Sequence, residues 1–207
     1  RKKKIIDASK YLLQWQVNIG SEGNISCRKK NEIYITPSGI KTSNLKQNDI
    51  SKVDLDGKIL NKKKPSSEIL LHSWIYRNHK DIGAVVHSHS KWASILSCMR
   101  INIPAFHYMV AEFGGSDIKC SKYATFGSEQ LSKYVNKVLH NRKGCLIANH
   151  GQVTFADTLE EAIDLSIALE KLSEQYYFLM ISRKAKLLSD KEMCKIVKLF
   201  KDYKVKH

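Results

Sequence analysis

The residues best suited to chemistry are three histidines. His87 and His89 stand one residue apart, directly after the apolar run Ala84-Val85-Val86. Residues two apart on a β-strand point to the same face, so both imidazoles could reach one metal ion. His150 follows a second apolar run and precedes Gly151, which makes it the candidate for a third ligand. Three imidazoles with one open coordination position are typical of a catalytic zinc site.

Glu68 is the carboxylate placed to act beside such a site. It follows Pro65, Ser66 and Ser67, a pattern that predicts a helix start with the acid in the first turn. The residue could be a fourth metal ligand, a helix-cap partner or a general acid/base. Hydroxyl groups at a helix N-terminus suit an anion, because unpaired backbone N–H groups point outward there. A phosphate held by the two serines would place a substrate carbon near both Glu68 and the metal.

The remaining sequence offers weaker signals. The turn Thr36-Pro37-Ser38-Gly39 could let backbone amides approach an anion, although such turns are usually only structural. Four other histidines on helices or at the terminus are interpreted as surface residues or hydrogen-bonded core residues: His72, His79, His140 and His207.

Hydrophobic periodicity predicts the elements that position these groups. One hairpin is expected over 25–28 and 32–36, and a second over 53–59. Strands are expected over 82–87, over 144–151 as a central strand, and over 152–155, and an extended segment is expected over 103–108. Helices are expected from residue 5 to before Gly20, after Pro65, over 91–99 and 128–140, from the Thr158 capping box, and after Ser189. The fold class is therefore α/β, with mostly antiparallel strands flanked by helices.

Composition sets outer bounds. A chain of 207 residues without an internal linker predicts one domain over 1–207, and no apolar run is long enough to suggest a membrane span. Five cysteines without Cys-x-x-Cys spacing argue against a disulfide framework and a thiolate zinc site. The net charge of +15 comes from dispersed lysines, so a solvated surface is favoured and nucleic-acid binding is not expected. A cytoplasmic protein is expected.

Several short motifs together resemble the class II aldolase/adducin family. They are, in chain order, GNIS, ITPSG, PSSE, AVVHSH, IPAFHYM, YATFG and NHG, and they span nearly the whole sequence. The resemblance implies a three-layer α/β/α fold and one Zn²⁺ per subunit. It also implies a C4 homotetramer with active sites at the subunit interfaces.

The resemblance also implies roles for individual positions. Zinc would be held by His87, His89 and His150, with Glu68 as both metal neighbour and base. Tyr108, contributed across a subunit boundary, would exchange a proton with the aldehyde oxygen. The substrate phosphate would contact Asn24, Ser38, Gly39, Ser66 and Ser67, while Phe126 would line the substrate pocket and Tyr203 would lie on a C-terminal tail that closes over it.

The implied reaction is reversible cleavage of a ketose 1-phosphate resembling L-fuculose 1-phosphate. The products would be dihydroxyacetone phosphate and an aldehyde such as lactaldehyde, formed through a metal-stabilised enediolate. The chain departs from the family pattern at Ser38 (for Thr), at Asn149 (for His) and at Ser21-Glu22 (for Thr-Ala). Alternatives are a sugar-phosphate 4-epimerase, a methylthioribulose-1-phosphate dehydratase, or a non-catalytic adducin-like interaction module. PSSE, where epimerases tend to have PSSD, favours the aldolase.

Overall fold

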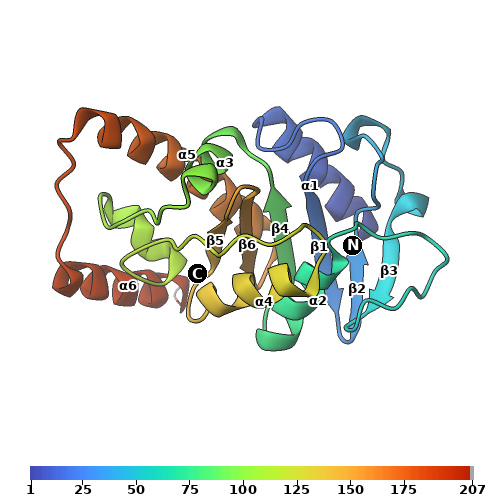
Figure 1. The fold of residues 1–207 in the computed structure, drawn as a ribbon. Helices are drawn as coiled ribbons and strands as arrows, with labels where there is room; N and C mark the ends of the chain where they lie inside the picture. The colour runs from blue at the N-terminus through green and yellow to red at the C-terminus, as the bar shows by residue number, and fades with distance from the viewer. Residues whose placement is uncertain (206–207) are drawn as a thin grey trace.

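The computed structural model describes residues 1–205, and side chains as far as residue 202. Its strands form one six-stranded sheet in the order β3-β2-β1-β4-β6-β5, and every neighbouring pair is antiparallel (Figure 1). The strands are β1 (Asn24–Lys29), β2 (Glu32–Ile35), β3 (Ser51–Asp54), β4 (Ala84–Ser88), β5 (Gly144–Ile147) and β6 (Gly151–Ala156). The expected antiparallel sheet is confirmed.

Helices cover both faces of the sheet, which gives three layers. The α-helices are α1 (Lys2–Gln14), α2 (Ile69–Asn78), α3 (Lys91–Met99), α4 (Glu129–Val138), α5 (Leu159–Ser182) and α6 (Asp190–Val205). Helices α1, α3 and α5 share one apolar core with the sheet, and α2 and α4 share a second core on the opposite face. The predicted α/β/α arrangement is therefore the observed one.

Alternation along β4 divides its side chains between the two cores. Ala84 and Val86 face α1, α3 and α5, whereas Val85 faces α2 and α4. His87 has the same parity as Val85, so its ring lies on the α2 side of the sheet. Because all five residues of β4 are buried, the strand carries His87 into the interior of the molecule.

The structure corrects two predicted elements near the site. Residues 144–151 do not form one central strand, because β5 ends at Ile147 at the edge of the sheet and a tight turn joins it to β6. Glu68 lies at the N-cap of α2 rather than inside its first turn. An N-cap residue has non-helical backbone angles, here φ −99° and ψ 19°, so its side chain can leave the helix surface.

Three further boundaries differ from expectation. Helix α1 ends at Gln14, earlier than the apolar periodicity suggested. The expected extended segment over 103–108 ends where Tyr108 begins a 3₁₀ helix, η3 (Tyr108–Phe113), which packs against α6. Helix α6 continues through Tyr203, where a tail was expected, and the side chain of Tyr203 lies outside the described part of the chain.

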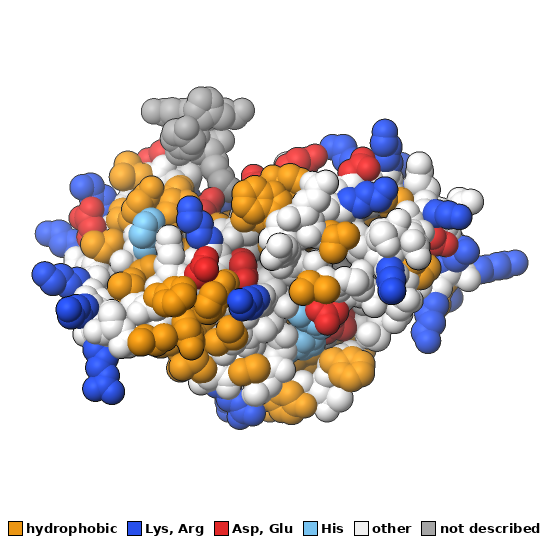
Figure 2. All heavy atoms as spheres, turned by 90° about the horizontal axis from the view of Figure 1, so that it is seen from above, with side chains coloured by type: hydrophobic (Ala, Val, Ile, Leu, Met, Phe, Trp, Pro, Cys, Tyr) orange, Lys and Arg blue, Asp and Glu red, His pale blue; other side chains and the backbone are white. Residues whose placement is uncertain are grey.

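The surface is consistent with the interpretation of the basic charge. Lysine and arginine side chains are dispersed around the face in Figure 2 and are not collected into one patch. Among the described residues, no helix is both long and apolar enough to cross a membrane.

Candidate metal and phosphate site

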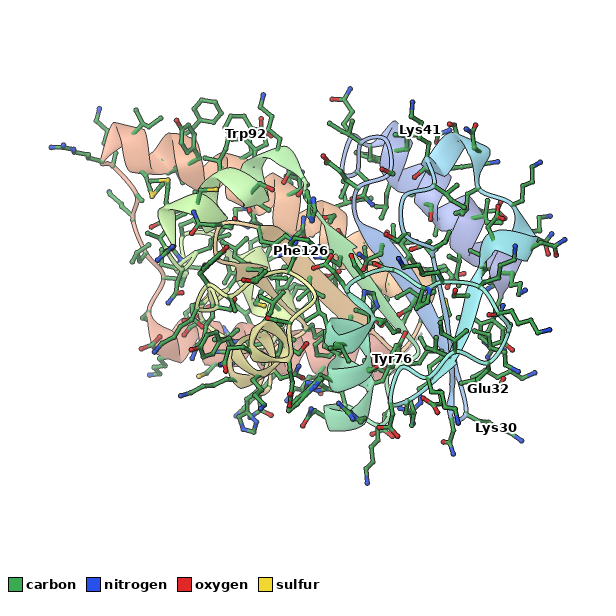
Figure 3. The ribbon with its side chains drawn as sticks, turned by 45° about the vertical axis from the view of Figure 1, so that its right-hand side comes forward. Lys30, Glu32, Lys41, Tyr76, Trp92 and Phe126 are labelled. Carbon is green, nitrogen blue, oxygen red and sulfur yellow. The ribbon has the colours of Figure 1, made fainter. Side chains whose placement is uncertain are left out.

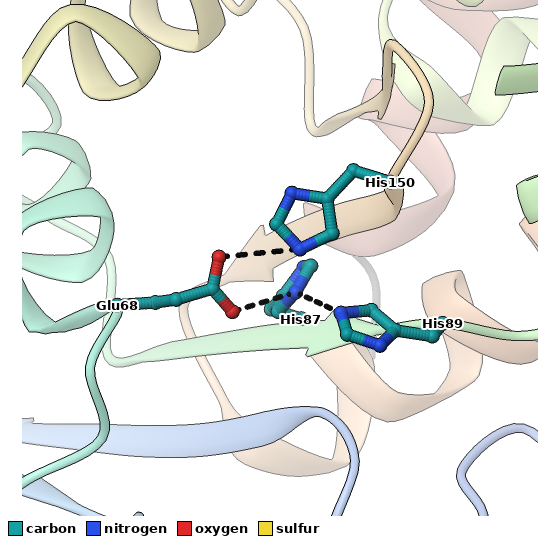
Figure 4. Close-up of side chains that lie close together, drawn as sticks. All are labelled: Glu68, His87, His89 and His150. Carbon is teal, nitrogen blue, oxygen red and sulfur yellow. Dashed lines mark hydrogen bonds and ion pairs between the residues drawn. The ribbon is translucent and has the colours of Figure 1, made fainter. Parts of the chain in front are cut away.

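Three imidazoles and one carboxylate converge at the end of β4 (Figure 4). His87 Nε2 lies 3.0 Å from His89 Nε2 and 2.9 Å from Glu68 Oε2. His150 Nε2 lies 3.3 Å from Glu68 Oε1. One potential ligand atom from each of the four residues lies within 4.8 Å of the others. The structure thus brings together all four residues that the sequence predicted as metal ligands.

A hydrogen bond from the sheet orients His87, and the anchoring of α3 fixes the backbone at His89. His87 Nδ1 lies 2.7 Å from the carbonyl oxygen of Gln152, to which it donates, so Nε2 is the nitrogen that faces the cluster. The chain leaves β4 at His89 and enters α3, whose N-terminal amides of Trp92 and Ala93 donate to the carboxylate of Glu170. This anchoring of α3 by α5 fixes the direction of the backbone on both sides of His89.

The third histidine is placed by the tight β5–β6 turn. Asn149 has φ +53°, a left-handed conformation that asparagine tolerates better than most residues. The amide of His150 donates to the carbonyl of Ile147 across the turn and contacts Ser97 Oγ at 3.2 Å. The turn, rather than a continuous strand, therefore aims His150 at the other two rings.

Electrostatics in the cluster favour a positive charge beside Glu68. Burial opposes ionisation of this carboxyl, but the charge of His87 and a hydrogen bond with it lower the pKa of Glu68 below its usual value. Burial, followed by the neighbouring His87, lowers the pKa of both His89 and His150 to about 4. Burial also opposes protonation of His87, yet Glu68 raises its pKa.

The donor set fits a divalent cation. With Nδ1 of His87 donating to Gln152, a neutral His87 presents a lone pair to Glu68, and the two acceptors repel unless a positive charge lies between them. Glu68 Oε1 is buried and accepts no hydrogen bond, although His150 Nε2 lies 3.3 Å from it. Nitrogen and carboxylate ligands of this kind suit zinc and neighbouring transition metals. The residues that would hold the ion are His87, His89 and His150, with Glu68 beside them.

A cavity of about 620 Å³ opens beside the cluster. The loop before α2 meets the loop after β2 there, because Ser66 N donates to Thr36 O. Every residue predicted to contact phosphate lies on the cavity wall: Asn24, Ser38, Gly39, Ser66 and Ser67. No lysine or arginine is among the described residues that line this cavity, so hydroxyl groups and backbone amides are the groups available to an anion.

Asn24 also forms a hydrogen bond with the carboxylate of Glu68. Its side-chain nitrogen donates to Glu68 Oε2 at 3.1 Å, and its oxygen faces His72. Ser66 Oγ accepts a hydrogen bond from the amide of Glu68, which holds the N-cap in position. Two of the predicted phosphate residues are therefore also bonded to the proposed base.

The aromatic residues divide into two groups. Phe126, predicted for the pocket, lines the cavity with its side chain 66% exposed (Figure 3). Tyr108 stands 51% exposed on η3, stacks on His107, and is absent from the cavity wall of its own chain. Tyr123 and Glu22 line the cavity although sequence reasoning gave them no role. Tyr123 is the first residue of the YATFG motif, and its place in that motif could have indicated that it lies at the site.

Gly151 is needed for the close approach of β6 to the end of β4. A Cβ at this position would lie 2.3 Å from the carbonyl oxygen of Ser88 and 3.2 Å from Cα of His89. We expect Gly151→Ala to push His89 away from His150 and to cost about 1–3 kcal/mol of folding free energy through overpacking. Metal affinity, measured by competition with a chelator, should fall at least about tenfold.

Gly20→Ala is the matched control for that substitution. Gly20 has φ +62°, and a Cβ at this position would have no atoms within 4 Å, so the cost of the change is conformational only. This variant should lose stability while keeping its metal affinity. Equal metal affinity in Gly151→Ala and the parent protein would contradict the account of the β4–β6 contact.

Comparison with known proteins agrees with this geometry. Residues 3–177 match the family model described as Class II Aldolase and Adducin N-terminal domain. The chain is 40% identical over 199 residues to a 5-methylthioribulose-1-phosphate/5-deoxyribulose-1-phosphate aldolase of Rhodospirillum rubrum, covering 96% of this chain and 90% of that protein. It is 37% identical over 202 residues to the L-fuculose phosphate aldolase of Escherichia coli K12, covering 97% of this chain and 94% of that protein.

A solved structure gives the same result. An L-fuculose 1-phosphate aldolase superimposes with a TM-score of 0.93 at 32% sequence identity, over 97% of this chain and 95% of that chain. The chain therefore belongs to the Class II Aldolase and Adducin family, and these relatives, which it matches over nearly its whole length, are named aldolases.

Proposed function

We propose that this protein is a zinc-dependent lyase that reversibly cleaves a ketose 1-phosphate into dihydroxyacetone phosphate and an aldehyde. The observation that carries the proposal is the convergence of three imidazoles and Glu68 beside a cavity walled by serines and a helix N-terminus. The end of the cavity with the serines and the helix N-terminus suits a phosphate. The end with the imidazoles and Glu68 suits a sugar carbon next to a carbonyl, from which a proton is removed. The aldolase names of the relatives support the same reaction.

The bound metal would act as a Lewis acid toward the carbonyl and hydroxyl oxygens of the substrate. The chain supplies the remaining functions. Ser66, Ser67 and the 38–39 turn would hold the phosphate and so fix the distance from the phosphate to the reacting carbons. Glu68, which is ionised at neutral pH, would remove a proton from the hydroxymethyl carbon of dihydroxyacetone phosphate in condensation and return it after cleavage.

The proposed substrate carries an apolar end at the aldehyde half. Tyr123 and Phe126 present exposed rings at the cavity wall, which suits a methyl or methylthio group better than a second phosphate. L-Fuculose 1-phosphate, which yields lactaldehyde, meets this requirement. The second candidate is a 5-deoxy- or 5-methylthio-pentulose 1-phosphate, favoured by the name of the Rhodospirillum relative.

A panel of phosphorylated ketoses tests the proposal. The purified protein should release dihydroxyacetone phosphate from at least one of these ketose 1-phosphates, and the aldehyde should be identified by mass spectrometry. A change of configuration at C4 without cleavage would indicate an epimerase. Loss of water without dihydroxyacetone phosphate would indicate a dehydratase. Neither activity, together with no bound divalent ion, would favour an adducin-like interaction module.

We propose a role for Tyr108 that requires a second copy of the chain, in a C4 homotetramer. Its side chain is exposed and does not reach the cavity of its own chain. Tyr108→Phe should slow aldol cleavage about 10²-fold, because the aldehyde oxygen loses its proton partner, while proton exchange on dihydroxyacetone phosphate should continue. Stopped assays of both steps measure this difference.

Tyr123→Phe provides the comparison for Tyr108. Tyr123 lines the cavity within the same chain and stands near Arg100, so it is the alternative source of a phenol. If the cleavage defect follows Tyr123→Phe and leaves Tyr108→Phe at the parental rate, the cross-subunit assignment is wrong.

A further inference from the structure

A buried chain of polar side chains runs from the core to the proposed base. Tyr76 OH lies 2.9 Å from Ser26 Oγ, and Ser26 Oγ lies 2.7 Å from Nδ1 of His72. His72 Nε2 lies 2.5 Å from Asn24 Oδ1, and Asn24 Nδ2 donates to Glu68 Oε2. All five side chains are buried, and three of them, Tyr76, Ser26 and His72, have no exposed surface.

Two regular elements create this chain. His72 and Tyr76 stand four residues apart on one face of α2, and Glu68 lies at the N-cap of that helix, four residues before His72. Asn24 and Ser26 stand two residues apart on β1 and point to that same face of the sheet. Figure 3 shows Tyr76 on α2, where the helix lies against the sheet. Side chains from α2 and its N-cap therefore alternate with side chains from β1 along the hydrogen-bonded series.

The direction of the first hydrogen bonds follows from Glu68. An ionised carboxylate only accepts hydrogen bonds, so the NH₂ group of Asn24 must face it. The amide oxygen of Asn24 is then the atom that faces His72. Because a carbonyl oxygen cannot donate, Nε2 of His72 must carry the hydrogen in this contact.

The remaining bonds follow from His72. His72 is fully buried and its two ring nitrogens face neutral groups, Ser26 and Asn24, so burial disfavours a charged ring and the ring is neutral at neutral pH. A neutral ring protonated on Nε2 has a lone pair on Nδ1, to which Ser26 must donate. Ser26 Oγ then accepts from the hydroxyl of Tyr76. Every hydrogen in the chain thus points toward Glu68.

We propose that His72 is a positioning residue that locks the Asn24 amide with its N–H toward Glu68. This inference rests on the proposed function, because it states that the hydrogen-bonded side chains hold Glu68, the base of that reaction, in position. If His72 carried its hydrogen on Nδ1 instead, Nε2 would be an acceptor and the Asn24 amide could turn over. Asn24 would then present its oxygen to the carboxylate, and Glu68 would lose both its donor and its fixed orientation.

The tautomer of His72 provides a test that does not depend on activity. Nitrogen-15 correlation spectra of the intact protein at pH 7 distinguish Nε2–H from Nδ1–H and from the doubly protonated ring. Assignment of the His72 signals uses their loss in His72→Gln. A neutral ring with its hydrogen on Nε2 is expected. A ring whose hydrogen lies on Nδ1, with none on Nε2, overturns the proposal whatever reaction the protein catalyses.

A pair of serine variants tests the consequence for the base. Ser26→Ala removes the donor to Nδ1, and we expect the rate constant for proton exchange on dihydroxyacetone phosphate to fall about tenfold, with KM and metal content unchanged. Ser73→Ala is the matched control, since Ser73 is equally buried, lies next to His72, and has no hydrogen-bond partner for its hydroxyl. The control should exchange at the parental rate.

A conservative replacement separates positioning from general damage to the core. Ser26→Thr restores the hydroxyl donor and should recover most of the exchange rate. Tyr76→Phe keeps the aromatic ring and leaves the Ser26 donor to Nδ1 of His72 in place, so it should retain most of the exchange rate. Equal losses in Ser26→Ala and Ser73→Ala, or no loss in Ser26→Ala, contradict the proposal, and if Ser26→Ala does not fold, the tautomer of His72 decides. A parent protein without any exchange rejects the proposed function, and the tautomer then decides this inference alone.

Discussion

Glu68→Gln is expected to reduce proton exchange at the hydroxymethyl carbon of dihydroxyacetone phosphate by about 10²- to 10⁴-fold, the range that a positioned acid/base contributes. Glutamine keeps the size of the side chain and loses the ability to take up a proton. The amide would also present a donor or an acceptor to Asn24 Nδ2 and His87 Nε2, which now contact the carboxylate. The three imidazoles remain, so the variant should still bind a metal ion.

The measurement combines isotope exchange with metal content. Deuterium incorporation into dihydroxyacetone phosphate is followed by NMR, and the metal is quantified in the same preparation. Glu22→Gln is the control, because Glu22 is an exposed carboxylate on the same cavity wall but outside the metal cluster. Undiminished exchange in Glu68→Gln would remove Glu68 as the base, and a large loss in Glu22→Gln would move that role to Glu22.

His89→Ala is expected to remove the metal and the activity together. The variant deletes one of three nitrogen ligands and opens the partly exposed side of the cluster to water. The loss of affinity should exceed the roughly 10- to 100-fold change that follows from disturbing a residue behind a ligand. Isothermal titration with zinc, and cleavage assays at saturating metal, measure the two effects separately.

A histidine outside the cluster controls for the loss of an imidazole in general. His79 packs against Phe155 with the ring centroids 4.4 Å apart, and it is not part of the metal group. His79→Ala should lose some folding stability and retain both metal and activity. Full metal occupancy in His89→Ala would contradict its assignment as a ligand.

Much of the architecture could be predicted from local patterns. The apolar run before His87, the capping box at Thr158 and the amphipathic helices all predicted elements that the structure contains. The family and its three-layer fold were likewise predicted from short motifs and are confirmed. The individual strands and helices depend on neighbours close in sequence, so hydrophobic periodicity predicts them well, whereas the family and the layers came from the resemblance.

The errors arose where tertiary contacts override local preference. Apolar residues from Gly144 onward predicted one strand, whereas Asn149 adopts a left-handed conformation and the chain reverses. The acid after Pro65 was expected in the first helical turn, whereas the side chain of Glu68 is drawn to the histidines. Both departures are at the site, where side-chain placement for chemistry competes with the regular element.

Sequence reasoning gave no role to three residues of the proposed positioning chain: His72, Ser26 and Tyr76. Considered alone, a helical histidine is more simply a satisfied core residue, and that description is correct as far as it goes. The signal was the spacing of four that joins it to Glu68 and Tyr76, opposite the spacing of two between Asn24 and Ser26. Only the packing of α2 against β1 shows that these two patterns meet.

The central claim is that His87, His89 and His150, with Glu68, hold one catalytic divalent cation. X-ray absorption spectroscopy at the zinc edge, combined with elemental analysis of the purified protein, tests it most directly. The account predicts about one zinc per chain with nitrogen ligands at roughly 2.0–2.1 Å and no sulfur ligand. A metal-free protein that neither binds zinc nor responds to chelators, or a zinc ion bound through cysteine sulfur at about 2.3 Å, would contradict it.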